Sequence, residues 1–237
     1  MYKGLLCYDG TNYFGWQKTA FGPSIQEEIE KAIFHITGEK VTPEAASRTD
    51  RGVHARGQVI QFALEKAKEP KSLLRGLNAV LPPDIRLLDI MACEFHPTLD
   101  AIVKEYHYLL CLNSVQSPME RLYSWHIPQP LDIGKIEKAI PFLLGTQDFS
   151  AFANEQEKNP MCTLDSIYLN GDHFQIQGNR FLYKMVRNIV GTLVDIGKKG
   201  LPADYIPALL ASRDRKKAGV TAPARGLYLH QVHYSSK

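Results

Sequence analysis

The order in which strands and helices are predicted to follow one another constrains the fold of this chain more than any other feature. In the first part of the chain the order is β-α-β-β-α-β, with strands predicted over residues 2–8, 41–46, 58–64 and 85–91. Ser24 and Glu27 form a capping box and Gly38 supplies a stop, so a helix is expected between the first two strands. A second, shorter helix is predicted from Pro70 to Leu77.

The same order returns in the second part of the chain, with one helix added. Strands are predicted over residues 103–112, 164–169, 173–177 and 227–234, and helices near 133–143, over 181–196 and from Pro202 onward. The dipeptide Asn170-Gly171 favours a β-hairpin between two of these strands.

The repeated order predicts an α+β fold built from two ferredoxin-like (βαββαβ) units, residues 1–97 and residues 98–237. Each unit is expected to hold an antiparallel sheet with helices on one side. Sheets covered on one side leave the other side open. We expect the two sheets to join edge to edge into one platform, a surface suited to a large ligand.

Composition excludes several classes of protein. With 237 residues, of which 44% are hydrophobic and 22% charged, the chain has the make-up of a folded globular protein that needs no metal or disulfide staple. The first residues lack the long apolar stretch of a signal peptide, and no run reaches roughly 18 apolar residues. We therefore expect a soluble, cytoplasmic protein with no membrane contact.

Metal and disulfide chemistry are not expected. The four cysteines stand far apart and form no C-x-x-C pair, so free thiols are predicted. His230 and His233 are three residues apart in a predicted strand, where side chains at that spacing point to opposite faces. The sequence therefore predicts no metal site and no cofactor.

Basic residues are gathered in three short stretches, although the formal net charge is only +3. The members of these stretches are Arg48, Arg51 and Arg56; Arg180, Lys184 and Arg187; and Arg213, Arg215, Lys216 and Lys217. Such clusters favour a polyanionic partner. The alternative is that each cluster is an ordinary solvated surface.

The loop around Asp50 is the densest candidate for chemistry. It is polar, rich in glycine and placed between two predicted strands, where reactive groups are commonly held. Arg48 and Arg51 flank Asp50, and nearby cations favour the ionised carboxylate, which can act as a nucleophile or a base. The alternative is an aspartate that caps a turn.

A second candidate surface is one face of the helix predicted over residues 181–196. Arg180, Lys184, Arg187 and Gly191 share this face, and the opposite face is apolar and predicted to be core. The basic face suits a carboxylate or a phosphate, and the glycine suits the close approach of a ligand or another backbone. A solvated face is again the alternative.

Four motifs follow one another along the chain. They are Tyr8-Asp9-Gly10-Thr11 with Gly15-Trp16-Gln17, Ser47-Arg48-Thr49-Asp50 with Gly52-Val53-His54-Ala55, Phe181-Leu182-Tyr183-Lys184-Met185-Val186-Arg187-Asn188, and Thr221-Ala222-Pro223-Ala224 with Gly226-Leu227-Tyr228-Leu229. The segment Lys104-Glu105-Tyr106-His107-Tyr108 lies between the second and the third. In this combination the chain resembles the TruA family of tRNA pseudouridine synthases, from residue 2 to residue 234.

The resemblance implies an enzyme that isomerises uridine to pseudouridine in the anticodon stem and loop of tRNA, at the positions conventionally numbered 38 to 40. It also implies a homodimer. Carried over residue by residue, the catalytic aspartate is Asp50 and the arginine that pairs with its carboxylate is Arg187. Tyr106 is the tyrosine that stacks on the target base, and Arg48 contacts the RNA nearby.

Two positions depart from the pattern of the family. Arg51 stands where a small residue is common, and Thr98 stands where an arginine is common. The second departure affects one secondary RNA contact and not the chemistry.

The implied reaction fits the residues. Uridine loses its N1 to C1′ bond, turns and rejoins through C5 without redox change, so a carboxylate, an aromatic platform and a cation suffice. A base inside a stem must leave its stack at a cost of a few kcal/mol. Stacking on Tyr106 would offset about 1–3 kcal/mol of that, unless Tyr106 is an ordinary core aromatic. Because Asp50 and Arg187 come from different units, we expect the active site between the units and the two side chains within salt-bridge reach.

Two other functions remain open. One is a catalytically silent RNA-binding protein on the same scaffold, against which the intact Asp50, Tyr106 and Arg187 argue. The other is a synthase of the same fold that acts on other RNA sites. Whether Asp50 attacks the base or the sugar is not decided by the sequence.

Overall fold

The computed structural model describes residues 1–156, 158–202 and 204–235, and the chain divides into two compact units. The second unit extends from Val103 to Leu227, and the first holds the residues before it together with those from Tyr228 onward. The division lies after Ile102, and the boundary expected from the sequence lies after residue 97. The last strand differs from the expectation, because it belongs from Tyr228 onward to the first unit.

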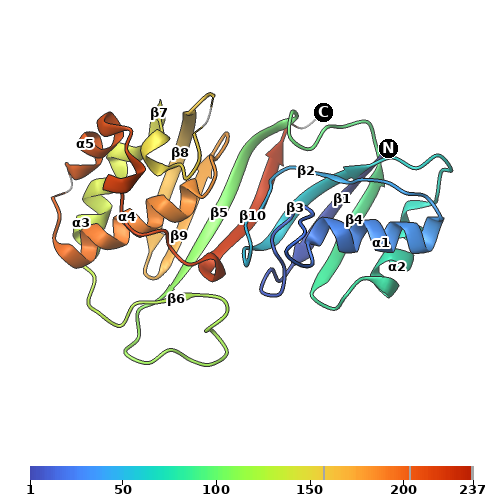
Figure 1. Cartoon of the computed structure of the whole chain (residues 1–237), viewed down its shortest axis with the longest axis horizontal. Coiled ribbons are helices and arrows are strands. Elements are labelled where there is room, and N and C mark those ends of the chain that lie inside the picture. Colours follow the sequence, from blue (N-terminus) through green and yellow to red (C-terminus); the bar gives the residue numbers. More distant parts are fainter. Residues whose placement is uncertain (157, 203, 236–237) are drawn as a thin grey trace. The chain divides into compact units, whose positions relative to one another are not determined.

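From β1 to β4 the strands and helices of the first unit follow the order predicted from the sequence, and β10 is added to them. They are β1 (Tyr2–Tyr8), α1 (Ile25–Thr37), β2 (Glu44–Ala45), β3 (His54–Phe62), α2 (Pro70–Val80), β4 (Ile85–Ala92) and β10 (Leu227–Tyr234). Strand β1 is antiparallel to β3 and β4, β10 runs parallel to β3, and the short β2 pairs with β3 near its end. Helices α1 and α2 pack against each other and lie on the same side of these strands (Figure 1).

Helix α1 forms where the capping signals predicted it. Ser24 Oγ accepts a hydrogen bond from the Glu27 N–H at 3.3 Å, and Gly38 follows the helix in the left-handed conformation at φ 77°. Ile25 and Ile33 on its apolar side are fully buried, each with 0% exposure. Local capping and burial of one face therefore define this helix together.

The second unit combines a small sheet with helices on one side of it. Its elements are β5 (Ala101–Cys111), β6 (Trp125–His126), α3 (Ile133–Ala139), β7 (Gly145–Asp148), β8 (Met161–Asn170), β9 (His173–Gly178), α4 (Met185–Lys199) and α5 (Tyr205–Ser212), with short 3-10 turns at Ile140–Leu143, Ser150–Phe152, Arg215–Lys217 and Ala224–Gly226. Strands β5, β9, β8 and β7 are each antiparallel to the next, and β6 runs parallel to β5.

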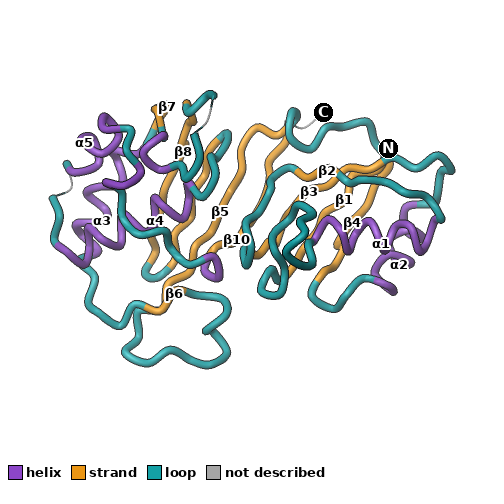
Figure 2. Tube along the Cα trace, viewed as in Figure 1, coloured by secondary structure: helices purple, strands orange, loops and turns teal. Residues whose placement is uncertain are grey.

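Helices α3 and α4 pack against each other, and together with α5 they gather beside β7, β8 and β9 (Figure 2). Helices combined with mostly antiparallel strands confirm the α+β class.

Helix α4 begins four residues later than the sequence predicted, at Met185 instead of Phe181. Lys184 precedes it in the left-handed conformation at φ 61°, and the Asn188 N–H donates the first helical bond to the Lys184 carbonyl. The predicted basic face is therefore wrong for Arg180 and Lys184, which lie outside the helix. The left-handed backbone of Lys184 causes the late start of the helix, and the spacing of apolar residues in the sequence does not reveal it.

Other predicted features are confirmed or shortened. The strand predicted over 41–46 is reduced to Glu44–Ala45. The β8–β9 hairpin is confirmed with its turn one residue further on, since Asn170 pairs with His173 and Gly171 has φ 63°. All four cysteines are free thiols. No helix within the described ranges has both the length and the apolarity that crossing a bilayer requires.

Candidate active site

The loop that carries Asp50 connects β2 to β3 and is clamped by backbone hydrogen bonds within its own unit. The Trp16 N–H donates to the Thr49 carbonyl at 3.0 Å, and the Gly52 N–H donates to the Tyr13 carbonyl at 3.3 Å. These bonds hold both sides of Asp50 against the segment that follows β1. The loop is therefore fixed in position instead of extending into solvent.

A glycine makes this close approach possible. Gly15 has φ 96°, and a Cβ placed on it would lie 2.6 Å from the Thr49 carbonyl oxygen and 3.1 Å from the Arg51 nitrogen. Both contacts are with main-chain atoms, which cannot rotate aside as a side chain can. Two of the sequence motifs, at residues 8–17 and 47–55, therefore pack against each other at Gly15, where no side chain fits.

A buried polar network lies beneath the loop. The hydroxyls of Tyr8 and Thr49 share a hydrogen bond of 2.7 Å, and the Gln58 amide donates to the Ser47 carbonyl at 2.6 Å. Burial raises the pKa of Tyr8 to about 12, against the opposing effect of its hydrogen bonds with Thr49 and Gln58. The phenol therefore stays protonated, and neutral groups anchor this end of the loop.

Asp50 itself is half-buried, with the exposed Arg48 and Arg51 on either side. The Val53 N–H donates to the main-chain carbonyl of Asp50 at 3.1 Å, so the backbone of Asp50 closes the turn. Arg51, which departs from the family pattern, lies with its guanidinium carbon 4.1 Å from the ring centroid of Phe14. The exposed Arg48 is accessible to a large ligand.

Arg187 is anchored in the second unit by an exchange of hydrogen bonds with Ala222. Its Nε donates to the Ala222 carbonyl at 2.8 Å, and the Ala222 N–H donates to the Arg187 carbonyl at 3.1 Å. Arg187 is half-buried, so the alternative of a solvated basic face does not hold for it. The close approach expected at Gly191 is made by the chain's own backbone, because a Cβ there would lie 1.7 Å from the Val220 carbonyl oxygen.

The segment that contacts Arg187 is fastened to α4 by a second arginine. Arg215 donates to Asn188 Oδ1 at 2.8 Å, to Thr221 Oγ1 at 2.7 Å and to the Gly219 carbonyl at 3.0 Å. Asn188 is fully buried, with 0% exposure. The sequence placed Asn188 and Thr221 in motifs but gave no sign of this network, which holds the peptide beside Arg187 in place.

Tyr106 lies in β5 opposite Ile176 of β9 and is only 6% exposed. Its ring meets that of Phe181 edge to face, with the centroids 5.1 Å apart. This packing matches the alternative of a core aromatic, so a role in stacking on a base stays a prediction. On the same strand, burial and the charge of Arg180 lower the pKa of Lys104.

The second departure from the family pattern, Thr98, bonds within its own unit. Its hydroxyl donates to the Ala45 carbonyl at 3.2 Å, and its N–H donates to His96 Nδ1 at 3.2 Å. These contacts tie the stretch after β4 to β2. Thr98 therefore has a structural role within the first unit.

Comparisons with known proteins agree with the resemblance. A family model described as tRNA pseudouridine synthase matches residues 6–97 and 139–235, which include Asp50 and Arg187 but not Tyr106. The protein named tRNA pseudouridine synthase A 2 of Protochlamydia amoebophila is 48% identical, over 97% of this chain and 92% of its own length. The tRNA pseudouridine synthase A of Moorella thermoacetica is 44% identical over 98% of both chains, and that of Streptococcus equi subsp. equi is 41% identical over 98% of both. Relatives at this identity over nearly the whole length, and a family model that includes the clamped Asp50 loop and the anchored Arg187, show that the chain belongs to the tRNA pseudouridine synthase family.

Proposed function

We propose that this protein isomerises uridine to pseudouridine in tRNA, in the anticodon stem and loop at the positions conventionally numbered 38 to 40. The observation that carries the proposal is the match to the family over almost the entire chain, including the Asp50 loop. In this proposal the protein consists of two ferredoxin-like units whose sheets join into one platform. It works as a homodimer in the cytoplasm.

The reaction balances without any added reagent. The N1–C1′ bond of uridine breaks and a C5–C1′ bond forms, while C5 loses a proton and N1 gains one. No electrons are transferred to or from an external partner, and no group is added. A carboxylate that acts as a nucleophile or a base, held in a fixed position, is therefore the central requirement.

Asp50 supplies this carboxylate in our proposal. The loop that carries it is clamped at Thr49 and at Gly52, which supports a carboxylate whose position is set before the substrate binds. Arg187 pairs with the carboxylate and keeps it ionised, and the hydrogen bond from its Nε to Ala222 fixes the plane of the guanidinium. The pairing of these two residues is itself part of the proposal.

Two further residues contact the RNA in this proposal. Tyr106 stacks on the base that leaves the helix, and Arg48 contacts the backbone near the target. The exposed side chain of Arg48 supports its role. Tyr106 needs a rearrangement of its contact with Phe181 before it can reach a base.

The test is the Asp50→Asn variant, which keeps the size and hydrogen-bonding capacity of the side chain but removes the carboxylate. We expect pseudouridine formation in tRNA to disappear while the affinity for tRNA stays nearly unchanged. Asp89→Asn is the matched control, because Asp89 is an exposed aspartate of the same unit, in β4, and we expect full activity from it. Substantial turnover by Asp50→Asn would remove Asp50 from the mechanism.

The two alternative functions give different results. A silent RNA-binding protein would bind tRNA but form no pseudouridine even with Asp50 intact. A synthase for other RNA sites would form it elsewhere. Mapping pseudouridine in the RNA of cells that lack this protein separates these cases, since our proposal predicts loss confined to the anticodon stem and loop of tRNA.

A further inference from the structure

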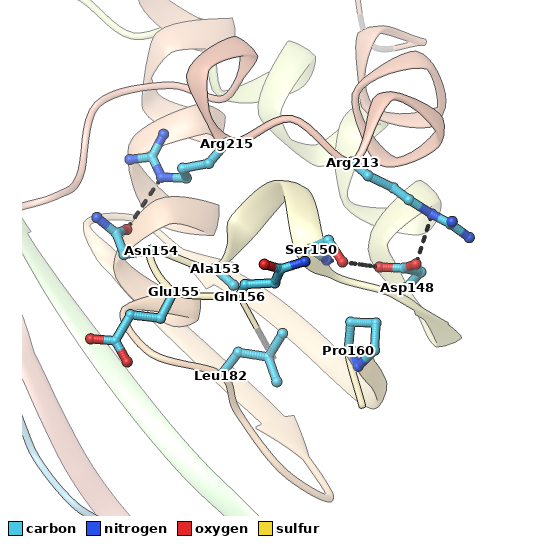
Figure 3. A pocket seen from close by; sticks show the side chains of 10 residues that line it. All are labelled: Asp148, Ser150, Ala153, Asn154, Glu155, Gln156, Pro160, Leu182, Arg213 and Arg215. Atoms are coloured by element: carbon cyan, nitrogen blue, oxygen red, sulfur yellow. Dashed lines mark hydrogen bonds and ion pairs between the residues drawn. The ribbon is translucent and has the colours of Figure 1, made fainter. Parts of the chain in front are cut away.

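The second unit holds a cavity of about 500 Å³ that the proposed reaction does not use. Figure 3 shows Arg213 and Arg215 along one side and the apolar Leu182 and Pro160 on the opposite side. The amides of Asn154 and Gln156 also line it. The lining therefore offers cations, hydrogen-bonding groups and an apolar surface together.

Arg213 is held at the rim of this cavity although it is exposed. Its Nε lies 2.8 Å from Asp148 Oδ2, and Asp148 Oδ1 in turn accepts hydrogen bonds from the N–H and the hydroxyl of Ser150, at 2.9 and 2.6 Å. The side chain of Arg213 is 70% exposed, and Figure 3 shows the end of its guanidinium directed outward. A guanidinium fixed through Nε presents its two terminal nitrogens as a fork, the geometry that binds phosphate.

The backbone of Arg213 adds an independent observation. Arg213 ends α5 in the left-handed conformation at φ 52°, a position that favours glycine. Among the described residues other than glycine, only Lys184 shares a positive φ. An arginine in this conformation is uncommon, and the turn places its side chain beside Asp148 at the rim of the cavity.

We infer that this cavity binds a nucleotide of the tRNA other than the reacting uridine, with the phosphate on Arg213 and the base in the cavity. The inference rests on the proposed function, which supplies tRNA as the substrate. The flat faces of a base pack on Leu182 and Pro160, and its polar edge meets the amides of Asn154 and Gln156.

The charges around the cavity fit a nucleotide better than a simple anion. Glu155 also lines the cavity, and its carboxylate accepts hydrogen bonds from an exocyclic amino group but repels an anion. Lys216 and Lys217, which follow Arg215 in the chain, are exposed and do not line the cavity. A phosphate therefore belongs on the arginine side of the cavity and a base on the side of Glu155.

The decisive variant is Arg213→Gly, because the backbone at this position favours glycine and the fold is retained. We expect an unchanged or higher Tm together with a Kd for tRNA raised about tenfold. If Arg213 contacts a phosphate, the log–log dependence of affinity on salt should also become shallower by about 0.7–0.9. Arg213→Lys, which keeps the charge, should retain most of the salt dependence. Lys138 is an exposed lysine in α3 that does not line the cavity, so Lys138→Gln should change neither the Kd for tRNA nor its salt dependence.

A second variant distinguishes the contribution of the base to tRNA affinity from that of the phosphate. Gln156→Ala should raise the Kd for tRNA several-fold without changing its salt dependence, because it removes an amide and no charge. Titration with cytidine monophosphate alone tests for a small-molecule site. Tight binding of that nucleotide that tRNA does not compete with would overturn the inference.

The outcomes distinguish this inference from the proposed function. An enzyme that forms pseudouridine in tRNA, and whose Arg213→Gly variant binds tRNA with unchanged affinity and unchanged salt dependence, overturns the inference alone. A wild-type protein that forms no pseudouridine in tRNA and does not bind it overturns both.

Discussion

Gly191 lies within α4, where alanine is ordinarily the better helix former by about 1 kcal/mol. We predict that Gly191→Ala nevertheless destabilises the protein. A Cβ at this position would lie 1.7 Å from the Val220 carbonyl oxygen and 3.3 Å from the Ala222 nitrogen. Because these are main-chain atoms, the segment must withdraw by about 1 Å or more before the contact becomes tolerable.

The size of the effect follows from the bonds that this withdrawal disturbs. The Ala222 N–H donates to the Arg187 carbonyl, and Arg187 Nε donates to the Ala222 carbonyl. A neutral hydrogen bond contributes about 1 kcal/mol and a charged one about 1.5–3 kcal/mol, and overpacking costs about 1–3 kcal/mol. If both bonds are lost, the sum of these costs less the gain in helix propensity lowers the free energy of unfolding by about 2.5–6 kcal/mol and the Tm by about 5–24 °C.

Thermal unfolding followed by circular dichroism measures this change, and Gly134→Ala in α3 is the matched control. A Cβ on Gly134 would meet only Asp132 Oδ1 at 3.5 Å, an ordinary contact, so that variant should be as stable as the wild type or slightly more stable. The folded fraction of Gly191→Ala should also form pseudouridine more slowly, because its Arg187 is displaced. A Gly191→Ala variant with the stability and activity of the wild type would refute the reasoning.

Two further predictions concern the first unit. Ser24→Ala removes the N-cap of α1 and should lower the free energy of unfolding by about 1 kcal/mol in denaturant titrations, with no change in the Kd for tRNA; an unaffected stability would contradict the role of the cap. The pKa of Tyr8 is raised from its ordinary value of 10.0 to about 12, so its neutral phenol stabilises the fold fully below pH 10, and this contribution is lost as the pH rises toward 12. Tyr8→Phe should therefore show a shallower fall of the unfolding free energy between these pH values than the wild type, and equal slopes would exclude the effect.

The elements that the sequence predicted well are those set by neighbouring residues. Helix α1 is defined by Ser24 and Gly38 within one continuous stretch. The β8–β9 hairpin depends on the turn at Gly171, and its error of one residue is the ordinary uncertainty of where such a turn begins. The Asp50 loop was also recognisable, because a polar stretch with glycines lies between two predicted strands.

The features that the sequence did not predict depend on contacts between distant parts of the chain. Tyr228 of β10 pairs with His54 of β3, and no local pattern encodes which strand a terminal strand will join. The four basic residues between positions 213 and 217 look alike in the sequence. In the structure Arg215 is half-buried and donates to the buried Asn188, whereas Arg213 is exposed and bonds Asp148 at the rim of a cavity. Composition cannot show this difference in burial.

The Asp50 loop and the Arg187 helix are built by the same physical means. Gly15 lets one stretch of backbone lie against the loop of Asp50, and Gly191 lets another lie against α4 beside Arg187. Main-chain atoms in such contacts cannot move aside by changing rotamer, so the backbone that carries Asp50 and the backbone that carries Arg187 are each held firmly in place. In the proposed isomerisation the chain's own side chains supply the nucleophile or base, so their placement and electrostatics strongly affect the barrier. Rigid backbone beneath both Asp50 and Arg187 is therefore what the proposed chemistry requires of this fold.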